Sequence, residues 1–244
     1  MIVIKIKYLN LRSGSINLLM IIIKLIGLNT QESSKPINQM DSAKSISKGR
    51  GRPKCFNEEQ ALEKAMTLFW KYGYEATSMS DLTFAMGITA PSLYSTYGDK
   101  SELFNRCIDY YLRHESCSME MIFKQAHSIK LAMELYLIEN LKRLVQEDKP
   151  KGCMLVVSTM NCSIQNQQIQ QSISEKRQLS KSNLLEKLLA AQASGEISTQ
   201  TNIQVMTDYY MTILQGLSLQ ARDGATFEQL ESVVHMAMQT WDHF

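Results

Sequence analysis

The stretch TSMSDLTFAMGITAPSLYSTYGDKSELF, residues 77–104, decides the fold of this chain. Ser78 and Asp81 have the spacing of a helix N-cap, in which a hydroxyl accepts from a free amide and an acid lies in the positive first turn. Gly87 ends this helix, because glycine adopts a positive φ without steric cost. Thr89 then has the position of a second cap. The pattern predicts two short helices joined by a turn.

The second helix is followed by the start of a third. Leu93 and Tyr97 lie four residues apart, so both side chains face inward. Asp99 and Glu102 have the spacing of a capping box and open the next helix. Residues 78–97 therefore read as a helix-turn-helix, the arrangement that places a helix in the major groove of DNA.

The outward side of the second helix carries small and hydroxyl-bearing residues that suit a groove. Such side chains approach bases closely and donate hydrogen bonds to phosphates. They are Ala90, Pro91, Ser92, Tyr94, Ser95 and Thr96. Lys100, in the first turn of the following helix, is expected to reach a phosphate. Periodicity alone is equally typical of a plain helical bundle.

Residues 50–106 resemble the N-terminal domain of TetR/AcrR-type transcriptional regulators. The matching pieces, in order, are GYEATSMSDL, MGITAPSLY and YGDKSELF. The resemblance implies a homodimer with a C-terminal domain that binds a small molecule. It also implies DNA contacts from Ser80, Thr89, Ala90, Pro91, Ser92, Tyr94, Thr96 and Lys100. Two positions depart from the pattern: Thr96 stands where the family often has His, and Ala90 offers only an apolar contact.

Positive charge is concentrated before the helix-turn-helix. Residues 1–54 hold ten Lys or Arg against two acids, whereas the remainder is net negative. Arg50, Arg52 and Lys54 lie in GRGRPK, and a flexible arm of this kind enters the minor groove beside a major-groove reader. A solvated tail is the alternative interpretation.

The length of 244 residues fits three segments. Residues 1–49 are an N-terminal extension that is disordered or mis-annotated. Met40 is the expected true start, with residues 1–39 upstream of it, and a membrane-tethered regulator is the minor alternative. Residues 50–117 form the DNA-binding domain, and residues 118–244 form the effector-binding and dimerisation domain. We expect a cytoplasmic protein without a membrane partner, because the apolar run at residues 16–28 is short for a bilayer span.

Catalytic and metal-binding patterns are missing from the sequence. The five cysteines include no CxxC pair, and the four histidines are isolated. No glycine-rich phosphate loop follows a strand. We therefore expect no enzyme activity, no cofactor and no metal, in a reducing compartment.

The C-terminal half predicts an all-α architecture, with helices near 122–147, 152–163, 166–194, 200–221 and 226–242. Its methionines and tyrosines suit an adaptable apolar pocket, although such stripes more often form core. The candidates for ligand contact are Met133, Tyr136, Met154 and Tyr209.

Two cysteines are candidate redox sensors. Cys153 lies at a predicted helix N-terminus beside Lys151, and both features lower a thiol pKa. Cys162 follows, and the segment resembles oxidant- and electrophile-sensing members of the family. A small buried cysteine is the alternative.

The last two helices are the candidate dimer interface, because each carries an apolar face. The residues proposed for it are Leu214, Leu217, Val234 and Trp241. Packing within one chain is the alternative. Together these features predict a repressor that binds a palindromic operator as a homodimer and leaves it when a ligand or oxidant moves the helix predicted from about Asp99 to about Met119. The competing hypothesis is a helical small-molecule-binding protein without DNA binding.

Overall fold

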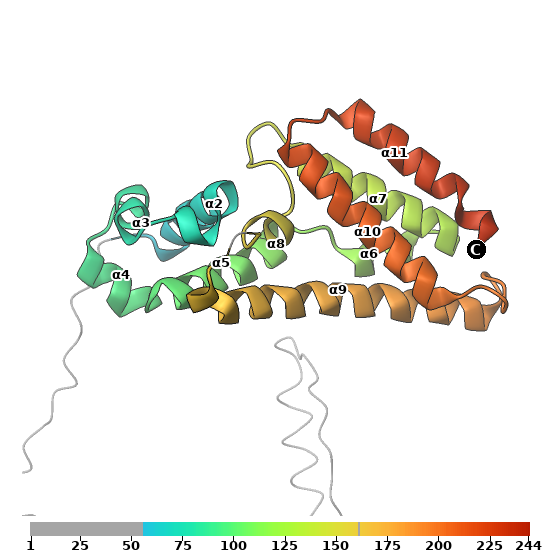
Figure 1. Cartoon of the computed structure of the whole chain (residues 1–244), viewed down its shortest axis with the longest axis horizontal. Coiled ribbons are helices and arrows are strands. Elements are labelled where there is room, and N and C mark those ends of the chain that lie inside the picture. The colour runs from blue at the N-terminus through green and yellow to red at the C-terminus, as the bar shows by residue number, and fades with distance from the viewer. Residues whose placement is uncertain (1–55, 161) are drawn as a thin grey trace, which may run out of the picture. The chain divides into compact units, whose positions relative to one another are not determined.

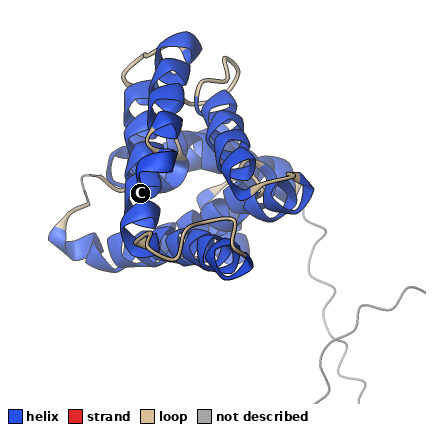
Figure 2. Cartoon of the chain, turned by 90° about the vertical axis from the view of Figure 1, so that its right-hand side faces the viewer, coloured by secondary structure: helices blue, strands red, loops and turns tan. Residues whose placement is uncertain are grey.

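The computed structural model describes residues 56–160 and 162–244, and both ranges consist of helices and connecting turns (Figure 1). Figure 2 shows no strand in this described part of the chain. The predicted all-α fold class is therefore confirmed. Within the same ranges, no helix is long and apolar enough to cross a bilayer.

Four helices come first, and their caps follow the sequence closely. They are α2 (Glu58–Ala76), α3 (Met79–Met86), α4 (Ala90–Tyr97) and α5 (Lys100–His114). Ser78 with Asp81 and Asp99 with Glu102 form complete capping boxes. The Thr89 hydroxyl accepts from the Ser92 amide, and Gly87 takes φ 70° at the end of α3. The predicted helix-turn-helix is present.

The remaining helices form the rest of the described chain. They are α6 (Met119–Gln125), α7 (Ile129–Leu144), α8 (Met154–Val157), η1 (Ile164–Asn166), α9 (Gln167–Ser194), α10 (Ile203–Arg222), α11 (Phe227–Gln239) and η2 (Trp241–His243). In Figure 1, α8 lies between α2 and α5 on one side and α10 on the other, in agreement with its contacts.

Two predicted helices differ from the observed ones. The helix expected over 122–147 is divided, because the Ser128 hydroxyl accepts from the Leu131 amide at 3.2 Å and caps a new helix there. The helix expected over 152–163 shrinks to the single turn α8. There the Ser158 carbonyl accepts from the Tyr74 amide at 2.8 Å, so a tertiary bond replaces a helical one.

The buried side chains form two clusters. The first joins α2, α3, α4 and α5 to α8 and the beginning of α9. The second joins α7, α10 and α11 to the later part of α9. Cys153 packs against both clusters. The turn at α8 therefore belongs to the same core as the helix-turn-helix, although about forty residues separate it from α5.

Gly152 fixes this turn, which we call the α8 junction (residues 152–158). Its carbonyl accepts from the buried Trp70 indole at 2.8 Å, and its amide donates to the Leu144 carbonyl at 2.9 Å. The next amide, of Cys153, donates to the Ser218 hydroxyl at 2.7 Å. The junction is thus bonded to α2, α7 and α10 within two residues.

We expect Gly152→Ala to destabilise the fold more than Gly224→Ala. Both glycines have positive φ, of 82° and 100°, but a Cβ at Gly152 would lie 2.7 Å from the Ser218 carbonyl oxygen, whereas one at Gly224 would have no neighbour within 4 Å. The backbone strain is about 1 kcal/mol in each variant, and the clash adds roughly 1–3 kcal/mol at Gly152. Equilibrium unfolding in urea measures both, and equal losses would contradict the close approach.

Candidate nucleic-acid interface and ligand pocket

Helices α3 and α4 are anchored from beneath by their apolar residues. Leu82 and Leu93 are fully buried, and Met86 and Tyr97 are nearly so. Ile88, in the turn between the helices, packs against the same core. This anchoring follows from the spacing of the apolar residues and leaves the opposite side of both helices facing outward.

The end of α4 is held by two bonds from other helices. The Tyr97 hydroxyl donates to the Glu58 carbonyl at 2.7 Å, and burial raises the pKa of Tyr97 to about 12. Arg106 donates to the Thr96 carbonyl at 3.0 Å, and its guanidinium carbon lies 5.8 Å from the centre of the Tyr97 ring. Because α2 and α5 both bond to it, α4 has a fixed direction relative to its neighbours.

The residues predicted to touch DNA lie on the outward side of this unit. Ser92 and Thr96 are half-buried, whereas Tyr94 is 53% exposed. The other exposed members of the set are Ser80, Thr89, Ala90, Pro91 and Ser95. Arg50, Arg52 and Lys54 lie outside the described residues.

Hydroxyl groups bond to one another along this side of α4. The Thr89 and Ser92 hydroxyls are 2.9 Å apart, and the Ser95 hydroxyl donates to the Ser92 carbonyl at 3.1 Å. The Tyr94 hydroxyl makes no bond to another part of the described chain, so both its donor and its acceptor face solvent. A short helix bearing such groups offers hydrogen bonds without bulk.

Helices α3 and α4 carry almost no charge. Between residues 79 and 97 the sequence holds one acid, Asp81, and no Lys or Arg. Hydrogen bonds from the Ser78 hydroxyl and amide keep the pKa of Asp81 low, so this carboxylate stays ionised as a cap. Attraction for a polyanion must therefore come from helix N-termini and from basic residues outside these two helices.

Lys100 is turned toward the protein rather than outward. Its ammonium lies 4.4 Å from the centre of the Tyr74 ring and 3.5 Å from the Glu75 carbonyl oxygen. Partial burial lowers the pKa of Lys100. The predicted phosphate contact therefore requires this side chain to leave Tyr74.

A pocket of about 90 Å³ lies among α7, α8, α9 and α10. Its walls are mainly apolar, with a few polar groups, as in many ligand sites. The lining residues are Tyr136, Asn140, Leu144, Cys153, Leu155, Val156, Arg177, Ser180, Met211, Leu214 and Gln215. Two of the predicted ligand contacts, Tyr136 and Cys153, are therefore brought together there.

The environment of Cys153 differs from the expected one. Burial of its thiol raises the pKa of Cys153, and Lys151 points elsewhere, because its ammonium donates to the Val145 and Gln146 carbonyls at 2.7 Å. The expectation of a lowered pKa is corrected: desolvation outweighs one short helical turn. Burial likewise raises the pKa of Cys162, which lies in a separate pocket with Tyr74 and Glu75.

Other predicted contacts are core residues instead. Met133 and Met154 are fully buried, one in each cluster, and the Tyr209 ring packs edge-on against Tyr210 and Phe244. None of the three lines the pocket around Cys153. Helical spacing identifies a face but does not reveal whether that face meets a cavity or another side chain.

The residues proposed for the dimer interface contact other parts of the same chain. Leu217, Val234 and Trp241 are only 2%, 0% and 8% exposed within a single chain, because α10 and α11 pack on each other and on α7. Leu214 lines the pocket. Burial of Leu217, Val234 and Trp241 favours the alternative of packing within one chain, whereas the interface role of Leu214 stays a prediction.

An outward-facing α4 that is anchored by its neighbours, on a helical body with its own pocket, is the arrangement typical of helix-turn-helix transcriptional regulators. Residues 61–107 match the model of the tetR family of bacterial regulatory proteins. The chain is 32% identical to the transcriptional repressor ComR of Escherichia coli K12, over 82% of this chain and 96% of ComR. It belongs to the TetR family of transcriptional regulators, which are not enzymes.

Further relatives align with this chain over most of their length. BdcR, another repressor of Escherichia coli K12, is 28% identical over 77% of this chain and 90% of BdcR. A cysteine mutant of the TetR family regulator CifR, solved with 26-base-pair operator DNA, is 31% identical with a TM-score of 0.76 and covers 78% of this chain and all of the CifR chain.

Cys153 should react slowly with iodoacetamide at pH 7, because a raised pKa leaves little thiolate. We expect its rate to be below that of the same cysteine in urea-unfolded protein and to keep rising above pH 9. Mass spectrometry of the modified peptide measures both rates. A folded-state rate at pH 7 above the unfolded one would restore the hypothesis of an activated thiol.

Proposed function

We propose that this protein is a repressor that binds a two-fold symmetric operator as a homodimer and is released by a small molecule. The observation that carries the proposal is the position of α4: its hydroxyl-rich side is exposed, while the Tyr97 hydroxyl bonds it to α2 and the Thr96 carbonyl bonds it to Arg106 of α5. The repressor names of ComR and BdcR and the operator DNA bound to CifR support the same conclusion.

Contacts with DNA divide into two kinds. Tyr94, with its free hydroxyl, and Lys100, once it leaves Tyr74, bind phosphates and act on every sequence alike. Ser92 and Ala90, near the start of α4, face base edges and set preference. Ser80, Thr89, Pro91, Ser95 and Thr96 complete the surface, and Arg50, Arg52 and Lys54 supply the minor-groove arm.

Substitutions in α4 test this division. Tyr94→Phe should weaken binding to specific and scrambled 26-base-pair duplexes by a similar factor of about 5, because it removes roughly 1 kcal/mol of phosphate hydrogen bonding. Ser92→Ala should instead change the ratio of the two affinities, since a base contact is worth about 1–3 kcal/mol. Fluorescence anisotropy on duplexes selected from genomic fragments gives these constants.

Tyr72→Phe is the matched control, because Tyr72 is 51% exposed and lies near the end of α2, whereas the α2 residue that bonds to α4 is Glu58 at the start of that helix. Its DNA affinity should stay at the wild-type value. An equal loss on every duplex for Ser92→Ala would remove Ser92 from the base-reading set, and unchanged binding in Tyr94→Phe would remove Tyr94 from the interface.

The dimer forms through the sides of α10 and α11 that the monomer leaves open. Val205 and Leu219 on α10 and Val233 and Met236 on α11 are exposed apolar residues. Gly216 lies between Val205 and Leu219 in the sequence of α10 and is exposed. A Cβ placed on Gly216 would have no neighbour within 4 Å, so another helix can approach closely there. Two such helices from each chain make a four-helix interface.

Met236→Glu should dissociate the dimer, because an unpaired carboxylate at the centre of an apolar contact is strongly unfavourable. Leu179→Glu on α9 is the control, since Met236 and Leu179 are 63% and 62% exposed and only the former lies on the proposed interface. Sedimentation equilibrium measures both variants. A monomer from Leu179→Glu and a dimer from Met236→Glu would place the interface on α9 instead.

Release depends on the α8 junction as well as on α5. Leu155 lines the ligand pocket, and the Trp70 and Tyr74 bonds tie residues 152 and 158 of the same turn to α2. A ligand that shifts this turn therefore biases the position of α2, against which α3 packs. The raised pKa of Cys153 favours a reversible ligand over an oxidant as the signal.

A further inference from the structure

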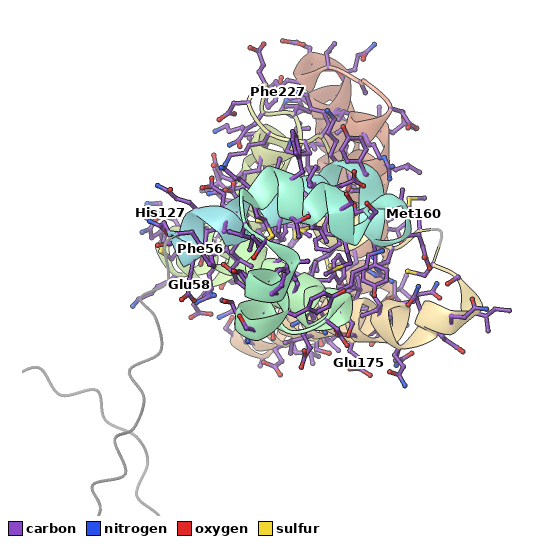
Figure 3. The ribbon with its side chains drawn as sticks, turned by 90° about the vertical axis from the view of Figure 1, so that its left-hand side faces the viewer. Phe56, Glu58, His127, Met160, Glu175 and Phe227 are labelled. Carbon is purple, nitrogen blue, oxygen red and sulfur yellow. The ribbon has the colours of Figure 1, made fainter. Side chains whose placement is uncertain are left out.

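The pocket around Cys153 has an outer neighbour. A second pocket, of about 210 Å³, is lined by Val156, Thr159, Met160, Gln170, Arg177 and Gln215. Three of these residues, Val156, Arg177 and Gln215, also line the inner pocket of about 90 Å³. Arg177 and Gln215 therefore lie where the two pockets adjoin, a place that we call the neck. Met160, labelled in Figure 3, lies on the outer side and is 52% exposed.

Arg177 is the one charged residue in the linings of both pockets. No carboxylate faces it from either lining, and it forms no ion pair with any residue in the described part of the chain. A cation that lines a partly enclosed space without a counter-ion favours an anion there.

The guanidinium also has donors to spare. One nitrogen, Nη1, donates to the Leu155 carbonyl at 2.7 Å. A guanidinium has five N–H donors in a planar fork that matches a carboxylate. The bond to Leu155 orients the fork at the neck, and its remaining donors meet no acceptor within residues 56–160 and 162–244. The Gln215 side chain beside it adds an amide that is exposed.

The inner pocket is apolar beyond this neck. Its walls include Leu144, Leu155, Val156, Met211 and Leu214. A volume of 90 Å³ corresponds to about three waters, at the roughly 30 Å³ that one water occupies in the liquid. The space therefore suits a short hydrocarbon chain and excludes a large multi-ring compound.

We propose that the ligand of this site is a small amphipathic monoanion, with its charged group at Arg177 and Gln215 and a short apolar tail in the inner pocket. This deepens the proposed function, because it names the chemical class of the effector. The Leu155 carbonyl belongs to the α8 junction, so an anion that shares the guanidinium acts directly on the turn that is bonded to α2.

Three six-carbon probes test the class: hexanoate, hexan-1-ol and hexylamine, titrated into the full-length protein by calorimetry at pH 7. We expect hexanoate to bind at least about 10-fold more tightly than hexanol, since a charge-assisted hydrogen bond contributes roughly 1.5–3 kcal/mol. Hexylamine should bind more weakly than hexanol, because its ammonium would face Arg177.

Arg177→Gln should abolish the preference for hexanoate over hexanol. Arg222→Gln is the matched control: Arg222 donates to the Val157 carbonyl of the same turn at 3.0 Å but lines neither of these two pockets. That variant should keep the preference. If both variants lose it equally, the arginines act only by supporting α8 and the proposal is overturned.

The proposal is equally overturned if hexanol or hexylamine matches hexanoate, or if none of the three binds. Fluorescence anisotropy of a selected operator duplex, measured with hexanoate present, then tests the ligand class separately from ligand-induced release of DNA. Tight binding of hexanoate without loss of DNA affinity would leave the ligand class standing and contradict ligand-induced release.

Discussion

The hydrogen bond between the buried Trp70 indole and the Gly152 carbonyl is the constraint on which the rest of the structure depends. A buried indole N–H without an acceptor would be unfavourable by about 1–3 kcal/mol, so the two groups must stay together. Gly152 permits the approach, because its φ of 82° and its crowded surroundings exclude a side chain. One contact thereby fixes a turn of the C-terminal half against the helix that supports α3 and α4.

The short helix α8 exists because other elements satisfy its backbone. Arg177 of α9 binds the Leu155 carbonyl, and Arg222 of α10 binds the Val157 carbonyl. The carbonyls of residues 152 and 158 accept from α2. A four-residue helix is unstable alone, so these bonds hold it where it is. The same dependence makes α8 sensitive to a ligand. A ligand that competes for the guanidinium donors of Arg177 removes part of the hydrogen bonding that holds α8 in place.

The DNA-facing side relies on geometry rather than on charge. Helices α3 and α4 carry Asp81 as their one charged residue, and Lys100 rests on Tyr74. The groups that remain are hydroxyls and helix N-termini on a unit whose direction α2 and α5 fix. Such a unit suits a close fit to a groove. The general electrostatic attraction to a polyanion must come from basic residues elsewhere.

The sequence by itself determined the helical class, the caps at Ser78, Thr89 and Asp99, and the side of α4 that faces outward, because these follow from local hydrogen bonding and from apolar spacing. Only the tertiary structure decided which segments pack against each face of a helix. It buried Leu217, Val234 and Trp241 within one chain, raised the pKa of Cys153, and bonded Arg177 to the Leu155 carbonyl in the wall of a pocket. Periodicity records which side of a helix is apolar, whereas burial and pKa depend on which distant segment comes to lie there.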